Sequence, residues 1–439
     1  MDADAIVIGA GAAGLAAARE LAGRSLRVIL LEARDRTGGR VWSVPTSRAA
    51  TPAELGAEFI HGQAAETMAL LREAGSAAIE TGGESWIRGE DGDLQREEDD
   101  FVPATGIFDG ARALAADESV DRFLRRFAGD AAMRERVAEA RMFVEGFEAA
   151  DPAVASARAI ADELRSGVDF ASARPLGGYP AVFERLLSTV AAAGVERCLS
   201  TVVRRIAWRR GAVAVDVTGA SGEARTIRAR VAVVTLPVGV LRHRGDETEV
   251  AFDPDLPTAK RAALGSLEMG HAVRVVLWFR TAFWERLRDG RYRDGAFFRR
   301  TGQPFAAYWT QFPVHSELIA AWAGGPRATA LSGLSAAERI GRALEGVGAL
   351  FGEPALVHDE FDGGATHDWS RDPFARGAYS YVAVGGGDAR AALAAPLDDT
   401  LFFAGEATSN DGQGGTVNGA LETGERAARE AAASLGVMA

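Results

Sequence analysis

Three glycines near the start of the chain constrain its fold more than any other feature. Gly9, Gly11 and Gly14 form a G-x-G-x-x-G pattern, preceded by a short apolar run and followed by an alanine-rich amphipathic segment. A second expected strand covers 27–31, is apolar after Arg27, and ends at Glu32. These patterns predict a strand, a helix and a second strand, which together form a βαβ unit of a parallel sheet.

Each position in this unit suits the binding of a phosphate. Gly9 permits a tight turn, Gly11 lets the backbone approach a pyrophosphate, and Gly14 lets the helix pack on the strand. The helix N-terminus offers unpaired N–H groups and the positive end of its dipole to the phosphates. Glu32 lies where a carboxylate can accept hydrogen bonds from ribose hydroxyls. A purely structural turn would explain the glycines alone, but the complete unit predicts dinucleotide binding.

The composition argues against several other classes of protein. A chain of 439 residues with 47% hydrophobic and 25% charged residues is ordinary for a globular protein with two or three cores. The net charge of -12 argues against nucleic acid as a partner, because nucleic-acid binding requires basic patches. No apolar run reaches the ~18–20 residues that span a bilayer, and no basic segment precedes the first apolar run. We therefore expect a soluble, cytoplasmic protein without a membrane partner.

Cysteine and histidine usage narrows the chemistry further. The single cysteine, Cys198, excludes an intrachain disulfide and a cysteine-based zinc cluster. The six histidines show no metal-ligand spacing and no G-x-S-x-G elbow is present, so we expect neither a metal site nor serine hydrolysis. The acidic run at 90–100 is expected to be a solvated loop. The minor alternative is that it lies at the edge of an entrance through which cations reach the site.

The residues after Glu32 indicate which dinucleotide is bound. The segment EARDRTGGRVWS (32–43) continues into a second turn, in which Gly38, Gly39 and Arg40 supply N–H groups and a guanidinium beside the same pyrophosphate. Nicotinamide enzymes do not need this turn. The segment resembles the flavin amine oxidase family, which includes monoamine oxidases, polyamine oxidases, L-amino-acid oxidases and histone-lysine demethylases. Other blocks resemble that family in the family's order over nearly the whole chain: ELGAEFIHG (54–62), PLGGYPAVFERL (175–186), LSTVVRRI (199–206), VVTLPVGVL (233–241), WSRDPFARGAYSYVAVG (369–385) and LFFAGEATSNDGQGGTVNGALETGERAARE (401–430).

The resemblance implies FAD as the cofactor and assigns residues to it. Glu32 would hold the adenosine ribose, Arg40 and the N–H of Glu406 the pyrophosphate, and the Val203 backbone the adenine. The Val417 N–H, at the start of the last helix, would lie near the N1/O2 edge of the flavin, where a helix N-terminus stabilises negative charge. The expected cofactor-binding residues are Gly9, Gly11, Gly14, Glu32, Ala33, Arg34, Gly39, Arg40, Gly56, Ala57, Glu58, Phe59, Val203, Gly405, Glu406, Thr416 and Val417.

The resemblance also indicates how the flavin is attached. Monoamine oxidases tether it through a cysteine just before a motif tyrosine, and here Ala378 precedes Tyr379. The flavin is therefore expected to be non-covalent. Cys198 lies at the start of a different expected strand, where we interpret it as a small buried hydrophobe.

On the substrate side, Trp369 and Tyr379 match aromatic positions beside the flavin, where their faces could flank a neutral or cationic amine. Monoamine oxidases complete the aromatic pair with a second tyrosine, where this chain has Thr416, so it looks more like the polyamine oxidase and demethylase branch. His61 is similar in position to a tunnel histidine of spermine-type oxidases and could hydrogen-bond an amine, or it could be structural. The demethylase subgroup itself is set aside, because the chain starts shortly before the first strand and shows no paired-heptad insertion.

Arg274 departs from the family pattern. The segment EMGHAVRVVLWFRTAFW resembles the family strand that carries a lysine at this position, and that lysine holds a water against flavin N5. Three readings stay open. In the first, Arg274 simply replaces the family lysine, in a chain that has one lysine, Lys260, among 49 basic residues. In the second, Arg274 binds a substrate carboxylate. In the third, it faces outward on an edge strand. In period-2 register it shares a face with Ala272, Val276 and Trp278.

The block order predicts an α/β fold, in which an FAD-binding Rossmann-like doubly wound sheet carries an interleaved α+β substrate domain. The FAD-binding domain is expected from 1–80, 183–268 and 371–439, and the substrate-binding domain from 81–182, mostly helical, and 269–370. The site is expected between them, at the carboxyl ends of the parallel strands.

The resulting functional prediction is oxidation of a small-molecule amine. A neutral amine would transfer hydride from its α-carbon to flavin N5, the imine would hydrolyse, and O2 would reoxidise the flavin with release of hydrogen peroxide. Tyr379, Trp369, His61 and Arg274 are the expected catalytic residues. A dehydrogenase, desaturase or amino-acid oxidase on the same fold is the nearer alternative, and a non-catalytic flavin-binding scaffold is the more distant one.

Overall fold

The computed structural model describes residues 1–49, 51–88, 92–97, 102–166, 172–300 and 302–437, except for the side chains of 102 and 103. Its first sheet is fully parallel, with the strand order β10-β2-β1-β14-β23. The bounds of these strands are Ala5–Ile8 for β1, Val28–Leu31 for β2, Glu196–Cys198 for β10, Val231–Val234 for β14 and Leu401–Phe403 for β23. All residues of β1, β2, β14 and β23 are buried, as expected for strands covered on both faces.

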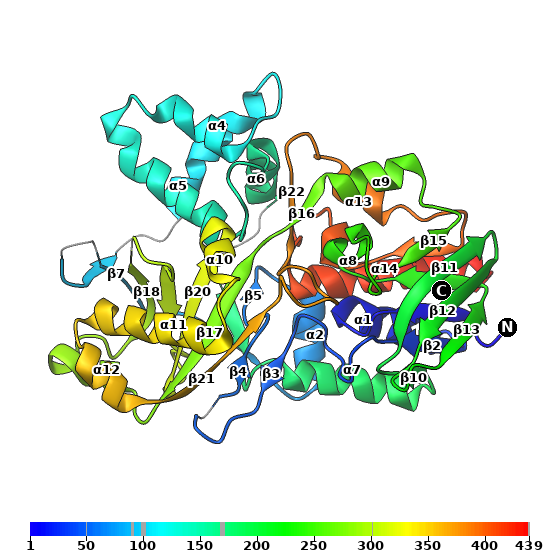
Figure 1. Ribbon diagram of the computed structural model, residues 1–439, viewed down its shortest axis with the longest axis horizontal. Coiled ribbons are helices and arrows are strands. Elements are labelled where there is room, and N and C mark those ends of the chain that lie inside the picture. Colours follow the sequence, from blue (N-terminus) through cyan, green and yellow to red (C-terminus); the bar gives the residue numbers. More distant parts are fainter. Residues whose placement is uncertain (50, 89–91, 98–101, 167–171, 301, 438–439) are drawn as a thin grey trace.

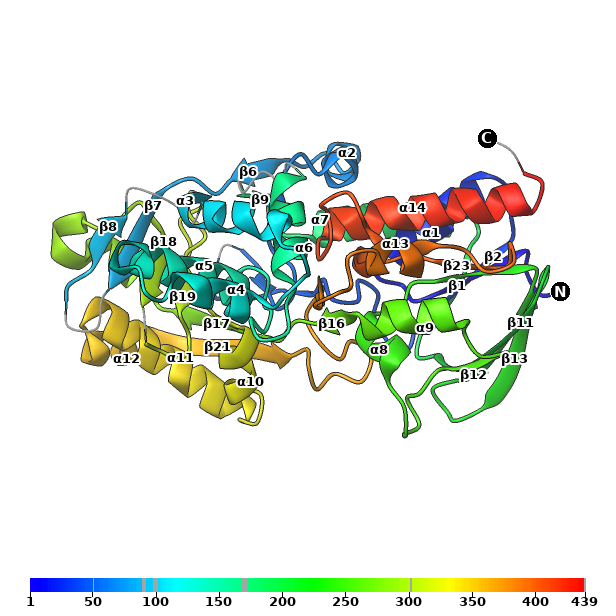
Figure 2. The same cartoon turned by 90° about the horizontal axis from the view of Figure 1, so that it is seen from above.

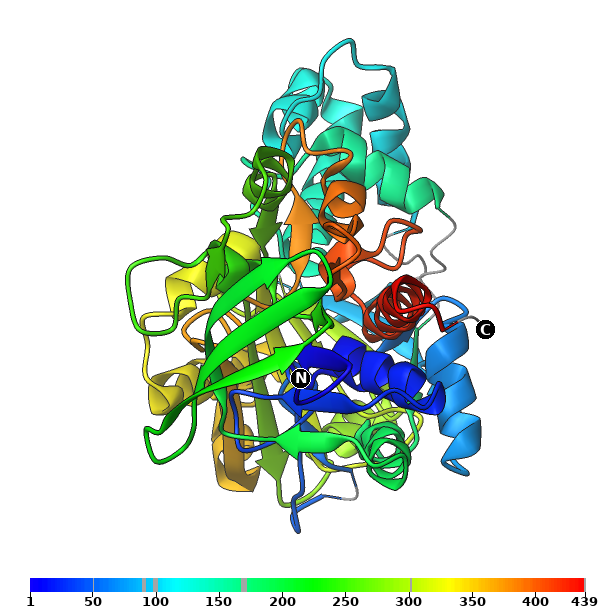
Figure 3. The same cartoon turned by 90° about the vertical axis from the view of Figure 1, so that its right-hand side faces the viewer.

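Alternate residues of these strands serve two cores. Val7 packs on one face with helices α1, α2, α7 and α14, whereas Ile6 and Ile8 pack on the other face with a four-stranded sheet. Figure 3 shows that sheet in green in front, with α1 and α14 packed together beside it. The covering elements are α1 (Ala12–Gly23), α2 (Ala65–Glu73), α7 (Pro180–Ala192), α14 (Val417–Ser434), β11 (Val202–Arg209), β12 (Ala212–Thr218), β13 (Ala224–Ala229) and β15 (Ala251–Asp253).

A second, seven-stranded sheet forms the other half of the molecule (Figures 1 and 2). Its order is β21-β17-β20-β19-β18-β7-β8. One face packs on α11 (Ala336–Phe351), through Val275 and Leu277 of β17 against Val347 and Leu350 of the helix. The strands are β7 (Glu84–Arg88), β8 (Gln95–Glu97), β17 (Ala272–Phe279), β18 (Gly295–Arg300), β19 (Ala307–Trp309), β20 (Leu318–Gly324) and β21 (Phe361–Asp368), and neighbouring helices are α10 (Gly325–Leu331), α12 (Pro354–Glu360) and η4 (Phe283–Gly290).

A helical region covers the far side of this sheet, at the top of Figure 1. It contains α3 (Val102–Thr105), η1 (Gly106–Ala113), α4 (Val120–Leu124), η2 (Arg125–Phe127), η3 (Ala131–Met133), α5 (Arg134–Gly146) and α6 (Ala157–Arg165). The expectation of helix for 81–182 therefore misses β7, β8 and β9 (Ser172–Pro175). The loop expected at 90–100 is wrong for 95–97, which pair as β8 with β7, while 90, 91 and 98–100 lie outside the described residues.

Short elements connect the two halves. Strand β16 (Leu267–Met269), which leads into β17, pairs with β22 (Ser380–Val382), and a three-stranded sheet brings β9 between β5 (Ile60–His61) and β6 (Ala78–Glu80). The remaining elements are β3 (Ser43–Val44), β4 (Ala53–Glu54), α8 (Val238–Arg242), α9 (Thr258–Gly265), α13 (Ala389–Ala394) and η5 (Glu406–Thr408). The chain thus has the predicted FAD-binding Rossmann-like α/β architecture with an interleaved second region, while the exact domain limits stay a prediction.

Two details differ from the sequence expectations. Cys198 ends strand β10 rather than starting a strand, and it is half-buried, with its Sγ 3.1 Å from Arg225 Nη2, so it is not a core hydrophobe. Arg274 lies inside the seven-stranded sheet with only 4% of its surface exposed, so the outward-facing edge reading is wrong. Among the described helices, none has both the length and the apolar character needed to cross a membrane.

Candidate active site

A cavity of about 500 Å³ extends from the carboxyl ends of the parallel strands to the inner face of the seven-stranded sheet. Every residue predicted to contact cofactor or substrate lines it, except Gly14. Gly14 is packed beneath the turn instead, because a Cβ on it would lie 1.8 Å from the Gly9 carbonyl oxygen. The structure therefore brings residues from 9 to 417 together, and their individual roles stay predictions.

The glycine turn faces a second glycine turn. Gly9 has a φ of +103°, and Gly11 caps the N-terminus of α1. Gly11 forms a β-bridge with Gly38, whose N–H donates to the Ala10 carbonyl at 2.9 Å. With no Cβ on either side, the two turns and the first N–H groups of α1 form a cradle that suits a pyrophosphate.

Glu32 stands at the end of β2, as predicted. Its carboxylate is buried and accepts hydrogen bonds from the N–H of Ala10 at 2.8 Å and of Arg34 at 2.9 Å. Arg34 is held in turn by Asp372, at 2.6 Å. Two backbone donors therefore orient the Glu32 side chain toward the cavity, where its remaining lone pairs can accept hydrogen bonds from ribose hydroxyls.

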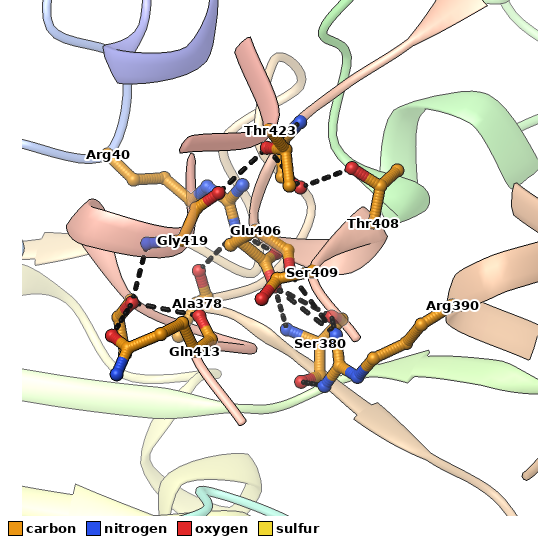
Figure 4. A network of polar contacts seen from close by, with 12 residues as sticks. Arg40, Ala378, Ser380, Arg390, Glu406, Thr408, Ser409, Gln413, Gly419 and Thr423 are labelled. Atoms are coloured by element: carbon orange, nitrogen blue, oxygen red, sulfur yellow. Dashed lines mark hydrogen bonds and ion pairs between the residues drawn. The ribbon is translucent and has the colours of Figure 1, made fainter. Parts of the chain in front are cut away.

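Arg40 is positioned by the C-terminal part of the chain (Figure 4). Its Nη1 donates to Glu406 Oε1 at 2.7 Å and to the Ala378 carbonyl at 2.8 Å. Burial acts to raise the pKa of Glu406, but the charges of Arg40 and Arg390 outweigh it and keep the pKa below the usual value. Ser380 links the second oxygen of Glu406 to Arg390, with distances of 2.7 and 2.9 Å. The network holds the Arg40 guanidinium beside the glycine cradle.

The last helix begins where the sequence predicts. Thr416 caps α14 by accepting a hydrogen bond from the Gly419 N–H at 2.9 Å, so Val417 is its first residue. The first turn of a helix leaves N–H groups without carbonyl partners, which favours negative charge at this end. At the opposite end of the cavity, the pairing of β11 with β12 shifts between Val203 and Arg205, next to the expected adenine contact.

The four expected catalytic residues all border the cavity. Trp369 is buried and donates from its indole to the Leu55 carbonyl at 2.8 Å, which fixes its ring beside Gly56. Tyr379 donates its hydroxyl to the Phe147 carbonyl at 2.5 Å, and its ring lies against Gly415. Burial raises the pKa of the Tyr379 hydroxyl far above its ordinary value, so this side chain stays neutral.

His61 contributes a neutral imidazole to the cavity. Burial lowers the pKa of its imidazole to about 4. Its Nδ1 is buried and has no hydrogen-bond partner among the described residues, and its ring lies 5.1 Å from the ring of Phe147. A buried nitrogen without a partner is costly in a protein interior, so this position favours a bound ligand or water.

Arg274 contacts the loop that carries Gly56 and Glu58. Its Nη1 donates to the Gly56 carbonyl at 3.0 Å and its Nη2 is paired with Glu58. The guanidinium lies 5.3 Å from the centre of the Trp309 ring. Arg274 therefore faces the cavity, on the strand face predicted from its register.

Sequence reasoning missed the aromatic wall and two acids. Facing positions of the seven-stranded sheet line the cavity, because Arg274 pairs with Trp322 and Trp309 pairs with Phe297 across neighbouring strands. Alternation in β19 and β20 could have indicated their faces, but not which face meets the cavity. Glu148, just after α5, and Glu163, in α6, also line it.

These features together define a flavoprotein fold in which one cavity extends from the dinucleotide cradle to the seven-stranded sheet. The dinucleotide cradle, the ribose acid and the helix N-terminus fit FAD, and Ala378 offers no nucleophile for a covalent link. The family described as flavin containing amine oxidoreductase matches residues 12–91 and 110–432, and the chain belongs to it. The cofactor of this family is a flavin, in agreement with the FAD-binding fold of the chain.

Individual relatives differ in reaction. Lysine-specific histone demethylase 1 homolog 2 of Oryza sativa subsp. japonica is 29% identical over 97% of this chain and 56% of its own length. The chain thus spans about half the length of the demethylases it matches. Putrescine oxidase of Kocuria rosea is 28% identical over 85% of this chain and 84% of its own. Cyclohexylamine oxidase from Brevibacterium oxydans IH-35A has a similar structure, with a TM-score of 0.81, 22% identity and coverage of 99% and 100% of the two chains.

Proposed function

We propose that the protein oxidises a diamine or polyamine, a small amine that carries a second positive charge. The observation that carries this proposal is a pair of carboxylates, Glu148 and Glu163, on the wall of a cavity that also holds the expected catalytic residues. Neither side chain has a hydrogen bond or an ion pair with the described part of the chain. Both residues are half-buried, and carboxylates that are partly removed from water are costly unless a cation joins them.

The pKa shifts of Glu148 and Glu163 support the binding of a cation beside these two side chains. Burial raises the pKa of Glu148, and the nearby Glu163 raises it further. Burial likewise raises the pKa of Glu163, although Arg390 acts against it. An ammonium group between them would relieve both effects, since an opposite charge favours the ionised form.

The other wall suits the reacting end of the substrate. Tyr379 and Trp369 present aromatic surface, which accommodates an amine whether neutral or charged. His61 is neutral, so one of its ring nitrogens can accept a hydrogen bond from the amine N–H. When bound, FAD would accept a hydride from the carbon next to nitrogen. Water would hydrolyse the resulting imine to an aldehyde with release of ammonia or an amine, and O2 would take two electrons and two protons to give hydrogen peroxide.

The contacts of Arg274 favour amines over amino acids. A substrate carboxylate would have to compete with Glu58 and the Gly56 carbonyl, which already accept hydrogen bonds from both terminal nitrogens of Arg274. It would also place a second anion beside Glu58. The residue type at position 274 also leaves a second candidate. The lysine that the family pattern has at this position is replaced by Arg274, so the protein could be a dehydrogenase that passes electrons to a partner other than O2.

An anaerobic reduction experiment tests the proposal. Purified holoprotein is mixed without oxygen with putrescine, spermidine, cyclohexylamine and a set of amino acids, and the flavin absorbance near ~450 nm is followed. We expect bleaching by the diamine or polyamine, slower bleaching by the monoamine and none by amino acids. Bleaching by amino acids, or by none of the compounds, contradicts the proposal. Admission of air then separates the candidates, because fast reoxidation indicates an oxidase and slow reoxidation a dehydrogenase.

Substitutions at the two acids test the cation site. Glu148→Gln and Glu163→Gln are expected to raise the apparent Kd of the diamine about tenfold or more, which is about 1.4 kcal/mol, and to change that of cyclohexylamine little. Glu145→Gln is the matched control, because Arg141 and Arg327 already neutralise this cavity-lining carboxylate. Equal losses for diamine and monoamine would mean that the two acids are structural.

A further inference from the structure

The buried carboxylate of Glu58 accepts hydrogen bonds from side chains of the seven-stranded sheet, including Arg274 and Trp309. Glu58 lies in the loop between β4 and β5, and only 4% of its surface is exposed. Its two oxygens accept hydrogen bonds from four side chains. The donors are Arg274, Arg174 Nε at 2.7 Å, Trp309 Nε1 at 2.9 Å and Gln311 Nε2 at 2.9 Å.

This environment keeps Glu58 ionised. Burial acts to raise the pKa of its carboxyl, but Arg274 and Arg174, with the hydrogen bonds from Gln311 and Trp309, hold it at about 2. Arg174 is itself occupied, since its Nη atoms donate to the carbonyls of Phe312 and Thr310, both at 3.1 Å. Glu58 therefore carries a full negative charge against Arg274 at neutral pH.

One nitrogen of Arg274 has no hydrogen-bond partner within the described residues. Its Nη1 is bonded to the Gly56 carbonyl and its Nη2 to Glu58, whereas its buried Nε has no partner within the described residues. Because both terminal nitrogens are held by the 56–58 segment, the plane of the guanidinium is set by this segment. Arg274 and Glu58 both border the cavity in which Gly56 to Phe59 are expected to meet the flavin ring.

The geometry points to Glu58 as a positioning residue that orients Arg274 and cancels its charge at the flavin side of the cavity. Arg274 then presents a fixed N–H donor rather than a free cation. This role is independent of the substrate, since it concerns the electrostatic potential at the flavin. It predicts that the two side chains act on the flavin in opposite directions.

Sulfite titration of the oxidised holoprotein measures this potential without turnover. Sulfite is an anion that adds to oxidised flavin, so an uncompensated positive charge nearby tightens its binding. At pH 6, Glu58→Gln removes a negative charge and is expected to lower the sulfite Kd on the order of tenfold, which is about 30 mV of two-electron midpoint potential. The matched control is Glu54→Gln: with a pKa of about 7, Glu54 is mostly protonated at pH 6, so this variant changes little charge.

A double-mutant cycle completes the test. Arg274→Met removes one positive charge, leaves Glu58 paired with Arg174 alone and is expected to raise the sulfite Kd by a similar factor. The double variant Glu58→Gln/Arg274→Met, whose net charge equals that of the wild type, is expected to return close to the wild-type Kd. If Glu58→Gln does not retain flavin, the comparison of Arg274→Met with the double variant gives the same answer. An unchanged Kd in either single variant, a shift of both in the same direction, or loss of flavin from all three would overturn the inference.

Discussion

Glu54 and Glu58 show at the scale of single residues that burial alone does not set protonation. Both side chains are about 95% buried and lie four positions apart. Burial raises the pKa of Glu54 to about 7, although hydrogen bonds from Ser43 and Tyr179 and the charge of Arg274 act against it. Glu58 has two arginines in contact, and its pKa falls to about 2. The difference follows from ion pairing, which compensates the cost of burying a charge.

The raised pKa of Glu54 predicts a pH-dependent stability. The Glu54 carboxyl binds its proton more tightly in the folded state than in the unfolded state. The contribution of this protonation to the unfolding free energy is fully present below about pH 4.5 and is lost as pH rises through 7. The Glu54→Gln variant stays neutral at every pH. Its unfolding free energy, measured relative to that of the wild type, should therefore be up to about 3 kcal/mol higher at pH 8 than at pH 4.5.

Urea unfolding of both proteins at the two pH values measures this difference. A difference in unfolding free energy that does not change between pH 4.5 and pH 8 would show that folding does not raise the pKa of the Glu54 carboxyl.

At the scale of elements, the cofactor cradle depends on how closely α14 approaches α1. Gly424 of α14 has no room for a side chain, since a Cβ there would lie 2.2 Å from the Ala13 carbonyl oxygen. Ala13 is in the first turn of α1, whose N–H groups face the cavity. The contact therefore links the helix that begins at Val417 to the helix that begins at the glycine turn.

Gly424→Ala should displace α1 from its cradle position. We expect a loss of about 1–3 kcal/mol in unfolding free energy and a weaker affinity for FAD, because the clash is with backbone that cannot rotate away. Gly23→Ala, near the end of α1 with no atom within 4 Å of its Cβ position, is the control and should be neutral or stabilising by up to about 1 kcal/mol. FAD titration and thermal unfolding check both variants, and equal FAD affinity in the two would contradict this account.

At the scale of the whole molecule, the cavity is lined by residues of both the parallel sheet and the seven-stranded sheet. These two sheets lie in the two halves of the molecule (Figure 2). The lining of the cavity comes from residues as far apart as Ile8 and Ala420. Bound FAD would therefore contact segments from the beginning, the middle and the end of the chain. A ligand that binds only the folded state stabilises it by mass action.

Removal of FAD should consequently lower the thermal midpoint of the whole chain in a single transition. With FAD at 100 times its Kd, the stabilisation is about 2.7 kcal/mol, which for a chain of this size is roughly 3 °C. Calorimetry of apoprotein with increasing FAD measures the shift. A midpoint that does not depend on FAD concentration would show that the cavity forms without a net contribution from the cofactor.

The cofactor half of the site could be predicted from the sequence because its geometry is local. The Ala10 N–H and the Glu32 carboxylate are 22 positions apart, and the strand, helix and strand between them bring the two together without help from the rest of the chain. The turn at Gly38 and the cap at Thr416 are likewise set by nearby residues. Resemblance to the family then indicated the cofactor and the register of Arg274.

Only the tertiary structure decided the substrate half. Arg274 and Glu58 are 216 positions apart, and nothing in either segment specifies the other as its partner. The same is true of Glu148 and Glu163, which reach the cavity of Tyr379 through the packing of a helical region on a sheet. Local patterns encode turns, caps and strand faces, because these depend on backbone geometry over a few residues. Which charged side chains become neighbours depends on long-range packing, and packing sets their pKa values and the ligand they suit.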